Sequence, residues 1–382
     1  MERVPCGICT HELWQMTPRC QRSLSRMDEA IRQARKEIPW LGVVPAQAAQ
    51  AVLKTYVQAW KNCWDGRAEE PAFKKRTARR AVDIPQGRDL RIKRLSRHWG
   101  QCWVPMIGPV KFRWTKNLPV GRRADKLNRI TGARLVHDAP GWHIVFRVRT
   151  EVDEPKPHQG LITGIDRGIA KLLALSNGTF REHGPWLTPG EAKRMKRLEQ
   201  KRERQRSDHE PGQPTSNRLR RTYDQIRQLR ARATRRALDW QHKTTTELAD
   251  ACGIIGVEDL AIRSMVKSAK GTVEAPGTKV RQKAGLNRSI SGESWGRAIT
   301  LLEYKLADRG GILVKVPAPN TSRRCSACGF ITPGSRESQD RFVCRADGCG
   351  YQVNADTNAA RNIEHAAGHA VSGRGDLGDA QS

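Results

Sequence analysis

The sequence predicts an α+β multidomain protein. Three features support this prediction: helical periodicity near the N-terminus, a period-two pattern in the segment that follows, and four closely spaced cysteines near the C-terminus. A chain of 382 residues is long enough for two or three domains, each with its own apolar core. The segments differ enough in pattern to be separate structural units.

Residues 1–82 predict a helical lobe. Leu24, Met27 and Ile31 share one face of a charged segment, and apolar residues recur at helical spacing between residues 45 and 64. Both patterns are typical of helices that bury one face.

Cys6 and Cys9, with His11 and Cys20 nearby, have the spacing of half a metal site. One such pair is a weak pattern. Ordinary thiols are the preferred interpretation of these cysteines.

Residues 83–155 alternate apolar and basic residues between Pro and Gly turns. A period of two predicts strands with one face in a core and the other in solvent. The segment therefore predicts a small β-barrel or sheet with one basic face. Proline and charge in residues 152–159 indicate a linker.

Residues 160–319 predict a second unit of strands and helices. Short apolar strands begin near residues 161 and 253, and residues 295–306 carry an apolar helical face. The polar, Gly-rich stretch 268–292 predicts a mobile loop, a candidate lid.

A pair of highly charged helices is predicted within residues 192–248. Between Lys193 and Arg236 sixteen Lys and Arg stand against five Asp and Glu, a local charge of +11. A coiled-coil spacer and a hairpin that follows a phosphate backbone both fit this composition. The charge density favours the hairpin.

Four cysteines within residues 320–351 predict a zinc ribbon: Cys325, Cys328, Cys344 and Cys349. Two residues separate the first pair, four the second, and fifteen lie between the pairs, so that four thiolates can converge. Disulfides or reduced thiols are the alternative. Residues 352–364 predict a helix, and residues 365–382 have the composition of a disordered tail.

The chain carries 69 Lys and Arg against 39 Asp and Glu, a net charge of +30. This excess indicates a polyanionic partner, because it otherwise acts only as self-repulsion. Nucleic acid is favoured over a membrane, since no apolar run has spanning length. With no hydrophobic signal-peptide segment, the sequence predicts a cytoplasmic protein.

Three acids interrupt apolar patterns: Asp166 on a first strand, Glu258 at the tip of a later strand, and Asp356 at the start of the last helix. Carboxylates in apolar surroundings are unfavourable unless they bind a cation. Three that converge could hold a pair of Mg²⁺ ions. Asp259 is the rival of Glu258, but neighbours in a strand point to opposite faces. This order of acids is that of an RNase H-like nuclease core.

Three motifs stand out: GIDRG at 164–168, GVEDL at 256–260 and a cysteine-rich run from Thr321 to Ile363 that ends in AD-x-NAA-x-NI. Together they resemble the TnpB family, RNA-guided DNA endonucleases that insertion sequences encode and that are related to type V CRISPR nucleases. The resemblance covers roughly residues 35–365. It implies a RuvC-like nuclease core with an inserted zinc ribbon, preceded by a helical recognition lobe and a wedge-like barrel.

The resemblance also implies roles. Asp166, Glu258 and Asp356 would be the catalytic acids and would bind two Mg²⁺ ions, and the four cysteines would hold a structural Zn²⁺. The wedge-like barrel would bind a guide RNA from the protein's own element, and the helical lobe would face the guide–target duplex on double-stranded DNA. A monomer associated with the bacterial nucleoid is the expected state.

The chain departs from the family pattern at two places. Its first residues do not match the strand and helix with which family members begin, which predicts a truncated N-terminus. In the family that segment forms part of the surface that recognises the flanking motif, so this recognition would be affected. The second cysteine pair, Cys344 and Cys349, encloses four residues where two are usual.

Three other interpretations fit parts of the pattern. A catalytically inactive or truncated RNA-guided regulator would be expected to lack an acid, and all three are present. A guide-independent transposase or junction resolvase needs no RNA-binding lobe. A zinc-ribbon RNA-binding protein without activity leaves the three acids without a role.

Overall fold

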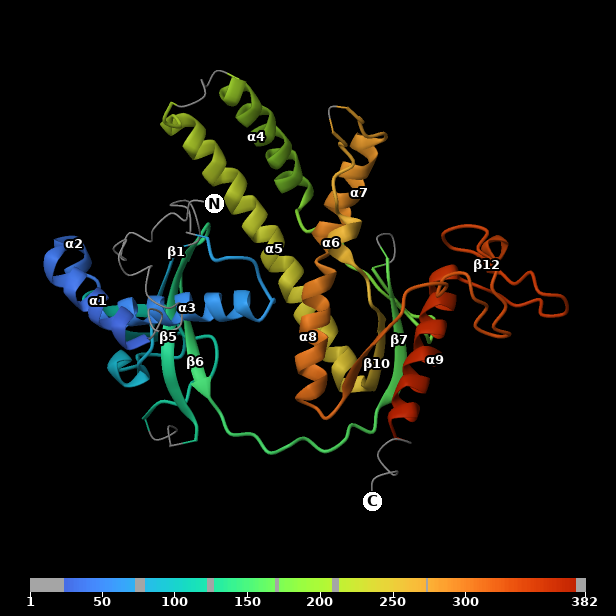
Figure 1. The fold of residues 1–382 in the computed structure, drawn as a ribbon, viewed down its shortest axis with the longest axis horizontal. Helices are drawn as coiled ribbons and strands as arrows, with labels where there is room; N and C mark the ends of the chain where they lie inside the picture. The colour runs from blue at the N-terminus through green and yellow to red at the C-terminus, as the bar shows by residue number, and fades with distance from the viewer. Residues whose placement is uncertain are drawn as a thin grey trace. The chain divides into compact units, whose positions relative to one another are not determined.

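A computed structural model of the chain describes residues 24–72, 80–121, 127–168, 172–207, 213–272 and 274–375. The chain divides into two compact units, Met1–Val152 and Asp153–Ser382 (Figure 1). The predicted pair Cys6 and Cys9, with His11 and Cys20, lies outside the described residues. Among the helices that are described, none is long and apolar enough to cross a membrane.

The first unit begins with helices α1 (Leu24–Glu37), α2 (Pro39–Gly42) and α3 (Ala46–Trp64). Ile31 of α1 packs against Ala49 and Leu53 of α3. Val52, which helical spacing places on the predicted apolar face, is 64% exposed. Ala48 is buried as helical spacing predicts, but the buried face of α3 continues through Ala49 and Leu53 instead of Val52.

Two antiparallel sheets follow, in the strand orders β1-β5-β6 and β2-β3-β4. The strands are β1 (Arg80–Ile84), β2 (Lys93–Arg94), β3 (Trp99–Val104), β4 (Gly108–Arg113), β5 (Arg129–Asp138) and β6 (Gly141–Arg149), with a short 3₁₀ helix at Gly87–Leu90. Both sheets bury residues in one core: Ile84, Leu90, Cys102, Val104, Ala133 and Leu135. Inward and outward residues alternate along β3, which explains the period-two pattern of the sequence.

The second unit is built on a sheet with the order β11-β10-β7-β8-β9. Strand β10 is parallel to both of its neighbours, whereas β8 pairs antiparallel with β7 and β9. The strands are β7 (Leu161–Arg167), β8 (Leu173–Leu175), β9 (Phe180–Arg181), β10 (Cys252–Glu258), β11 (Ile312–Val316), β12 (Phe342–Val343) and β13 (Gln352–Val353). The helices are α4 (Pro189–Ser207), α5 (Asn217–Ala251), α6 (Ile262–Met265), α7 (Val280–Glu293), α8 (Trp295–Ala307) and α9 (Ala355–Gly375).

Helices cover both faces of this sheet (Figure 1). On one face, Ile165 of β7 and Val257 of β10 belong to an apolar core with Leu248 of α5 and Leu306 of α8. Helix α9 packs on the opposite face, against β7 and β10. Because residues alternate between faces, Asp166 and Glu258 lie on the side that α9 covers.

The predicted charged helical hairpin is formed by α4 and α5. Leu198 of α4 is buried against Ile226 and Leu229 of α5. Glu191 accepts hydrogen bonds from Arg236, 2.5 Å away, and from Arg232, 3.3 Å away, and the bond from Arg236 is the largest cause that lowers the pKa of Glu191 to about 2. The hairpin is therefore held by a small apolar seam and by ion pairs at its base.

The composition of the stretch 268–292 predicts a loop, but the structure shows that only part of it is one. Helix α7 occupies most of its second half, and Ile290 is buried in the core that α5 and α8 share with the sheet. The prediction was wrong because few apolar residues mark the helix, and its one buried side chain depends on a tertiary contact.

The prediction of a disordered tail from residue 365 is wrong for residues 365–375. Helix α9 continues to that residue, and Ala367 is fully buried against Ile363 and Val316. Small residues and glycines in this stretch suggested disorder, but they allow the close packing that keeps the helix on the sheet.

Candidate active site and metal centre

The three predicted acids come from three elements of the second unit. Asp166 lies near the end of β7, and Glu258 is the last residue of β10. These strands are parallel, and Ile165 lies opposite Val257. Asp166 and Glu258 are the next residues on each strand, so they lie side by side at one edge of the sheet. Asp356 lies in the first turn of α9.

Two glycines let α9 approach the sheet. Gly164 and Gly256 each precede an acid by two residues and therefore share its face. A Cβ atom on Gly164 would lie 2.0 Å from the carbonyl oxygen of Ala360, and one on Gly256 would lie 2.7 Å from the Cβ of Ala367. Helix α9 packs directly against the backbone of the two strands, and this contact places its N-terminal turn, with Asp356, near Asp166 and Glu258.

The charges of Glu258 and Asp356 act on Asp166. Burial, followed by the charges of Glu258 and Asp356, raises the pKa of Asp166 from 3.8 to about 7, whereas Arg336 opposes the rise. Asp259, the alternative to Glu258, is exposed beyond the end of the strand. Asp356 is buried, and Asp166 and Glu258 are half-buried. A bound cation relieves repulsion among such carboxylates, so this donor set fits a hard cation such as Mg²⁺.

Three side chains that the sequence analysis missed hold these acids. Nη2 of Arg336 donates to Oδ1 of Asp356 at 3.1 Å. The hydroxyl of Thr321 donates to Oε1 of Glu258, and the guanidinium of Arg167 donates to the Glu258 backbone carbonyl. Thr321 opens the cysteine-rich motif and Arg167 lies within GIDRG, so both belong to motifs that stand out in the sequence. No spacing rule connects Arg336 with Asp356.

The structure brings the four predicted cysteines together. All four Sγ atoms lie within 4.8 Å of one another, with 3.9 Å between Cys325 and Cys349 and 3.6 Å between Cys328 and Cys344. Zinc–sulfur bonds of about 2.3 Å place tetrahedral sulfurs about 3.8 Å apart, whereas a disulfide requires about 2.0 Å. The donor set fits Zn²⁺, and the longer second pair does not prevent convergence.

The carboxylates are spaced more widely than the thiols. Within the described part of the chain, the cysteines alone form a group of three or more possible ligands that all lie within 4.8 Å of one another. The three carboxylates therefore do not all lie that close. A site that holds two ions requires a wider spread of ligands than a tetrahedral site with one ion.

Two asparagines of α9 attach the segment that carries the four cysteines, here called the ribbon, to the helix that carries Asp356. Nδ2 of Asn358 donates to the Arg324 carbonyl at 2.7 Å, and its Oδ1 accepts from the Ser326 N–H at 2.9 Å. Nδ2 of Asn362 donates to the Thr321 carbonyl at 2.8 Å. The two asparagines are one helical turn apart and share a face. They fix the ribbon to the helix that carries Asp356.

Two family models match the chain. The model described as "Probable transposase" matches residues 145–269, and the model described as "Cas12f1-like, TNB domain" matches residues 295–363. A protein of Escherichia coli (strain K12), "Putative RNA-guided DNA endonuclease InsQ", is 34% identical over 341 residues, which cover 89% of this chain and 79% of that protein. The chain belongs to the TnpB family.

Other relatives match over different lengths. A "Putative RNA-guided DNA endonuclease" of Streptomyces pristinaespiralis is 28% identical over 89% of this chain and 76% of its own. The "CRISPR-associated endodeoxyribonuclease Cas12f1" of Sulfoacidibacillus thermotolerans is 52% identical over 60 residues, 16% of this chain and 14% of its own.

Two solved structures resemble the chain at low identity. The "Cas12f1-sgRNA-target DNA complex" gives a TM-score of 0.48 at 16% identity, with 92% of this chain and 83% of that chain covered. The "Cas_phi3" mini-RNA-guided endonuclease gives 0.36 at 13% identity, with 70% and 57% covered. Both TM-scores are below 0.5, so neither likeness bears on the function of this TnpB-family chain.

Proposed function

We propose that this TnpB-family protein is an RNA-guided DNA endonuclease whose catalytic residues are Asp166, Glu258 and Asp356. The observation that carries the proposal is that the other two acids lie close enough to Asp166 to act on its charge. Burial and the charges of the other two raise the pKa of Asp166 to about 7. Carboxylates that are at least half-buried and gathered at the edge of a sheet favour a cation site.

The topology of the second unit supports a RuvC-like core of the RNase H type. Strands β7, β8 and β9 form an antiparallel meander, and β10 and β11 are added in parallel on the other side of β7. The acids lie on the first strand of the meander, on the first parallel strand and on the last helix. This is the order in which the sequence motifs predict them.

Mg²⁺ would be held by carboxylate oxygens of the three acids, and when bound it would activate water and stabilise the leaving oxygen of a phosphodiester. Arg336 holds Asp356 through an ion pair. Besides Mg²⁺, its guanidinium would be a further positive group that can bind a DNA phosphate. Thr321 fixes one oxygen of Glu258 through its hydrogen bond. The four cysteines would bind a structural Zn²⁺ that stabilises the ribbon beside these groups.

A guide RNA and double-stranded DNA are the proposed partners. The net charge of +30 and the basic hairpin of α4 and α5 provide the electrostatic attraction for nucleic acid. The relatives of the chain are described as RNA-guided endonucleases. Base pairing would then select the target, and the protein would read the shape of the duplex and a short flanking motif.

The test begins with the tagged protein, purified from cells that carry the flanking DNA of its gene, and with the RNA that accompanies it. We expect one discrete RNA with a constant part and a guide-length extension. The complex should then cut a matching DNA in Mg²⁺ but not in EDTA, and the Asp166→Ala variant should keep the RNA and lose cleavage. A discrete RNA without any cleavage would favour an inactive regulator, and absence of a discrete RNA would favour a guide-independent nuclease.

A further inference from the structure

Hydrogen bonds at the end of β10 hold the backbone on both sides of Glu258. The Arg167 guanidinium donates to the Glu258 backbone carbonyl, and the N–H of Asp259 donates to the Val316 carbonyl at 2.8 Å. These bonds tie the end of β10 to both neighbouring strands, β7 and β11. The Glu258 side chain can still turn, and the Thr321 hydroxyl donates to its Oε1. The bond to Thr321 therefore decides how this carboxylate is presented.

The Thr321 hydroxyl is itself held in place by helix α9. Nδ2 of Asn362 donates to the Thr321 carbonyl at 2.8 Å, and both side chains are buried. The hydroxyl also lies 3.0 Å from the Ala318 carbonyl oxygen. It has a single proton to donate, however, and a charged carboxylate is the stronger acceptor. Tertiary packing thus directs the proton of this hydroxyl to Glu258.

The bond to Thr321 occupies one of the two oxygens of Glu258. Among the described residues, no hydrogen bond to the other oxygen, Oε2, accompanies it. Groups that hydrogen-bond to a metal-binding side chain orient it toward the metal. An oxygen that already accepts a proton donates less charge to a cation, so Glu258 offers Oε2 as its coordinating atom.

Mg²⁺ and Ca²⁺ differ in the carboxylates that they prefer. Mg²⁺ requires a near-ideal octahedron with oxygens at about 2.0–2.1 Å, whereas Ca²⁺ accepts about six to eight oxygens at longer distances and often takes both oxygens of one carboxylate. A carboxylate that offers one oxygen suits Mg²⁺ and deprives Ca²⁺ of a ligand. The number of available oxygens therefore bears directly on the choice between the two ions.

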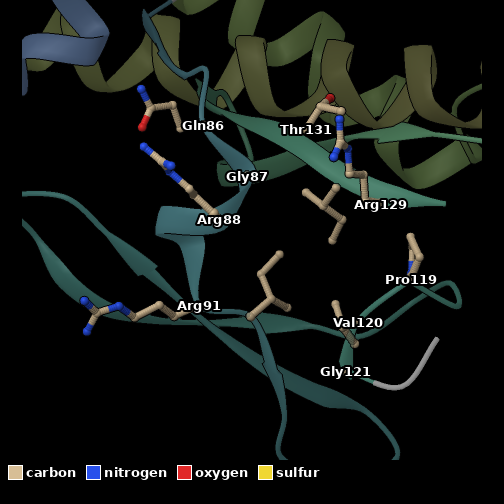
Figure 2. A pocket seen from close by; sticks show the side chains of 11 residues that line it. Gln86, Gly87, Arg88, Arg91, Pro119, Val120, Gly121, Arg129 and Thr131 are labelled. Atoms are coloured by element: carbon tan, nitrogen blue, oxygen red, sulfur yellow. The ribbon is translucent and has the colours of Figure 1, made fainter. Parts of the chain in front are cut away.

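A titration with a divalent cation reports on the acids and not on the cavity of the first unit. That cavity has a volume of about 730 Å³ (Figure 2). Arg88, Arg91 and Arg129 line it, and none of its described lining residues is an acid. Guanidinium groups repel Mg²⁺ and Ca²⁺ alike. Weak binding to exposed carboxylates elsewhere is measured in the Asp166→Asn variant, whose acid site lacks one ligand.

We propose that Thr321 sets the metal preference of the three acids. Its hydroxyl restricts Glu258 to one coordinating oxygen and thereby favours Mg²⁺ over Ca²⁺. The inference rests on the proposed function, because that function assigns a cation to Asp166, Glu258 and Asp356. Thr321 is a positioning residue, since it acts through its bond to Glu258. Because Asn362 holds the Thr321 carbonyl, the preference depends on the docking of α9.

The experiment titrates the full chain, free of nucleic acid, with Mg²⁺ and separately with Ca²⁺ in a calorimeter at one pH and ionic strength. Thr321→Val keeps the size of the side chain and removes the hydroxyl. Its Mg²⁺ affinity should fall roughly 10- to 100-fold, as for other residues that orient a metal ligand, while its Ca²⁺ affinity should fall much less or rise. The ratio of the two affinities should shift by about tenfold or more toward Ca²⁺. Thr321→Ser, which keeps the hydroxyl, should restore the wild-type ratio.

Three further variants test whether the effect is local. Thr321→Ala also lacks the hydroxyl and should give the same shift, even if valine strains the turn. Thr222→Val is the matched control and should keep both affinities, because Thr222 is fully buried and its hydroxyl donates to Gln205 within the hairpin of α4 and α5. Glu258→Ala/Thr321→Val should show the same ratio as Glu258→Ala alone, since the two residues act as one unit.

Unchanged affinities in Thr321→Val and Thr321→Ala, or an equal loss for both ions, would overturn the inference. A further shift of the ratio in the Glu258→Ala background would overturn it as well, because Thr321 would then not act through Glu258. Mg²⁺ binding as tight in Asp166→Asn as in the wild type would refute the acid site and the inference together.

The proposed function fails separately, because guided cleavage tests it. A shifted ratio in a protein without guided cleavage would support the role of Thr321 and refute the nuclease. Guided cleavage with an unshifted ratio would refute the role of Thr321 alone.

Discussion

Gly164 and Gly256 lie opposite each other on neighbouring parallel strands, and helix α9 crosses both. Neither residue has a side chain, so the helix backbone reaches the sheet. An acid follows each glycine two residues later, and the first turn of the helix supplies the third. The close contact between helix and sheet thus gathers the proposed catalytic acids.

Gly164→Ala should destabilise the second unit and abolish cleavage although every acid is retained. Its Cβ would lie 2.0 Å from the Ala360 carbonyl oxygen, so α9 has to move away, and overpacking of this kind costs about 1–3 kcal/mol. Urea denaturation measures the loss. Gly296→Ala on α8 is the control, because nothing lies within 4 Å of a Cβ there. Equal stability of the two variants would contradict the packing role of Gly164.

Asp166→Asn should stabilise the protein in EDTA while it abolishes cleavage. The folded-state pKa of about 7 lies above the ordinary 3.8, so ionisation of Asp166 lowers the stability of the wild type as the pH rises between these values. The gain in Tm of the variant should therefore grow from about pH 4 to about pH 7 and stay constant above. Asp259→Asn, at an exposed position, should show no such trend. A gain that does not depend on pH would exclude repulsion as its cause.

Arg336→Ala should slow cleavage strongly but leave RNA binding unchanged. The arginine holds Asp356 at 3.1 Å and opposes the charge of the acids. Arg336→Lys should recover only part of the rate, because an ammonium lacks the planar fork of donors. Cleavage under single-turnover conditions and a filter-binding assay separate the two effects. A normal rate in the alanine variant would leave Arg336 with a structural role only.

Asn358→Ala should destabilise the chain by about 1–3 kcal/mol, because the Ser326 N–H loses its partner and the Arg324 carbonyl keeps only the bond from Nδ2 of Asn362. Asn358→Asp keeps the acceptor for Ser326 and loses the donor for Arg324, so it separates the two bonds. Thermal unfolding measures stability, and zinc content shows whether the ribbon itself survives. Wild-type stability in both variants would show that the ribbon does not depend on this attachment.

Cys325→Ser should release zinc and lower the Tm, because one of four ligands is lost. Metal analysis and thermal unfolding, with and without a zinc chelator, test this expectation. Cys63→Ser is the control, since Cys63 is a free cysteine of α3 outside the cluster. Full zinc content in Cys325→Ser would contradict the proposed site.

Features that depend on local spacing were readable in the sequence. The cysteine spacing predicted convergence of Cys325, Cys328, Cys344 and Cys349, since residues close in the chain can meet in few ways. The motifs around Asp166 and Glu258 likewise marked strand ends, and they carried the resemblance to the TnpB family.

Contacts between distant residues were decided by the tertiary structure alone. Thr321 meets Glu258 across 63 residues, Arg336 meets Asp356 across 20, and Ile290 of α7 is buried by α5, α8 and the sheet. Such partners are chosen by the packing of whole elements, which leaves no periodicity or fixed spacing in the chain. The sequence by itself determined which residues could form the site, and the docking of α9 on two glycines decided how they meet.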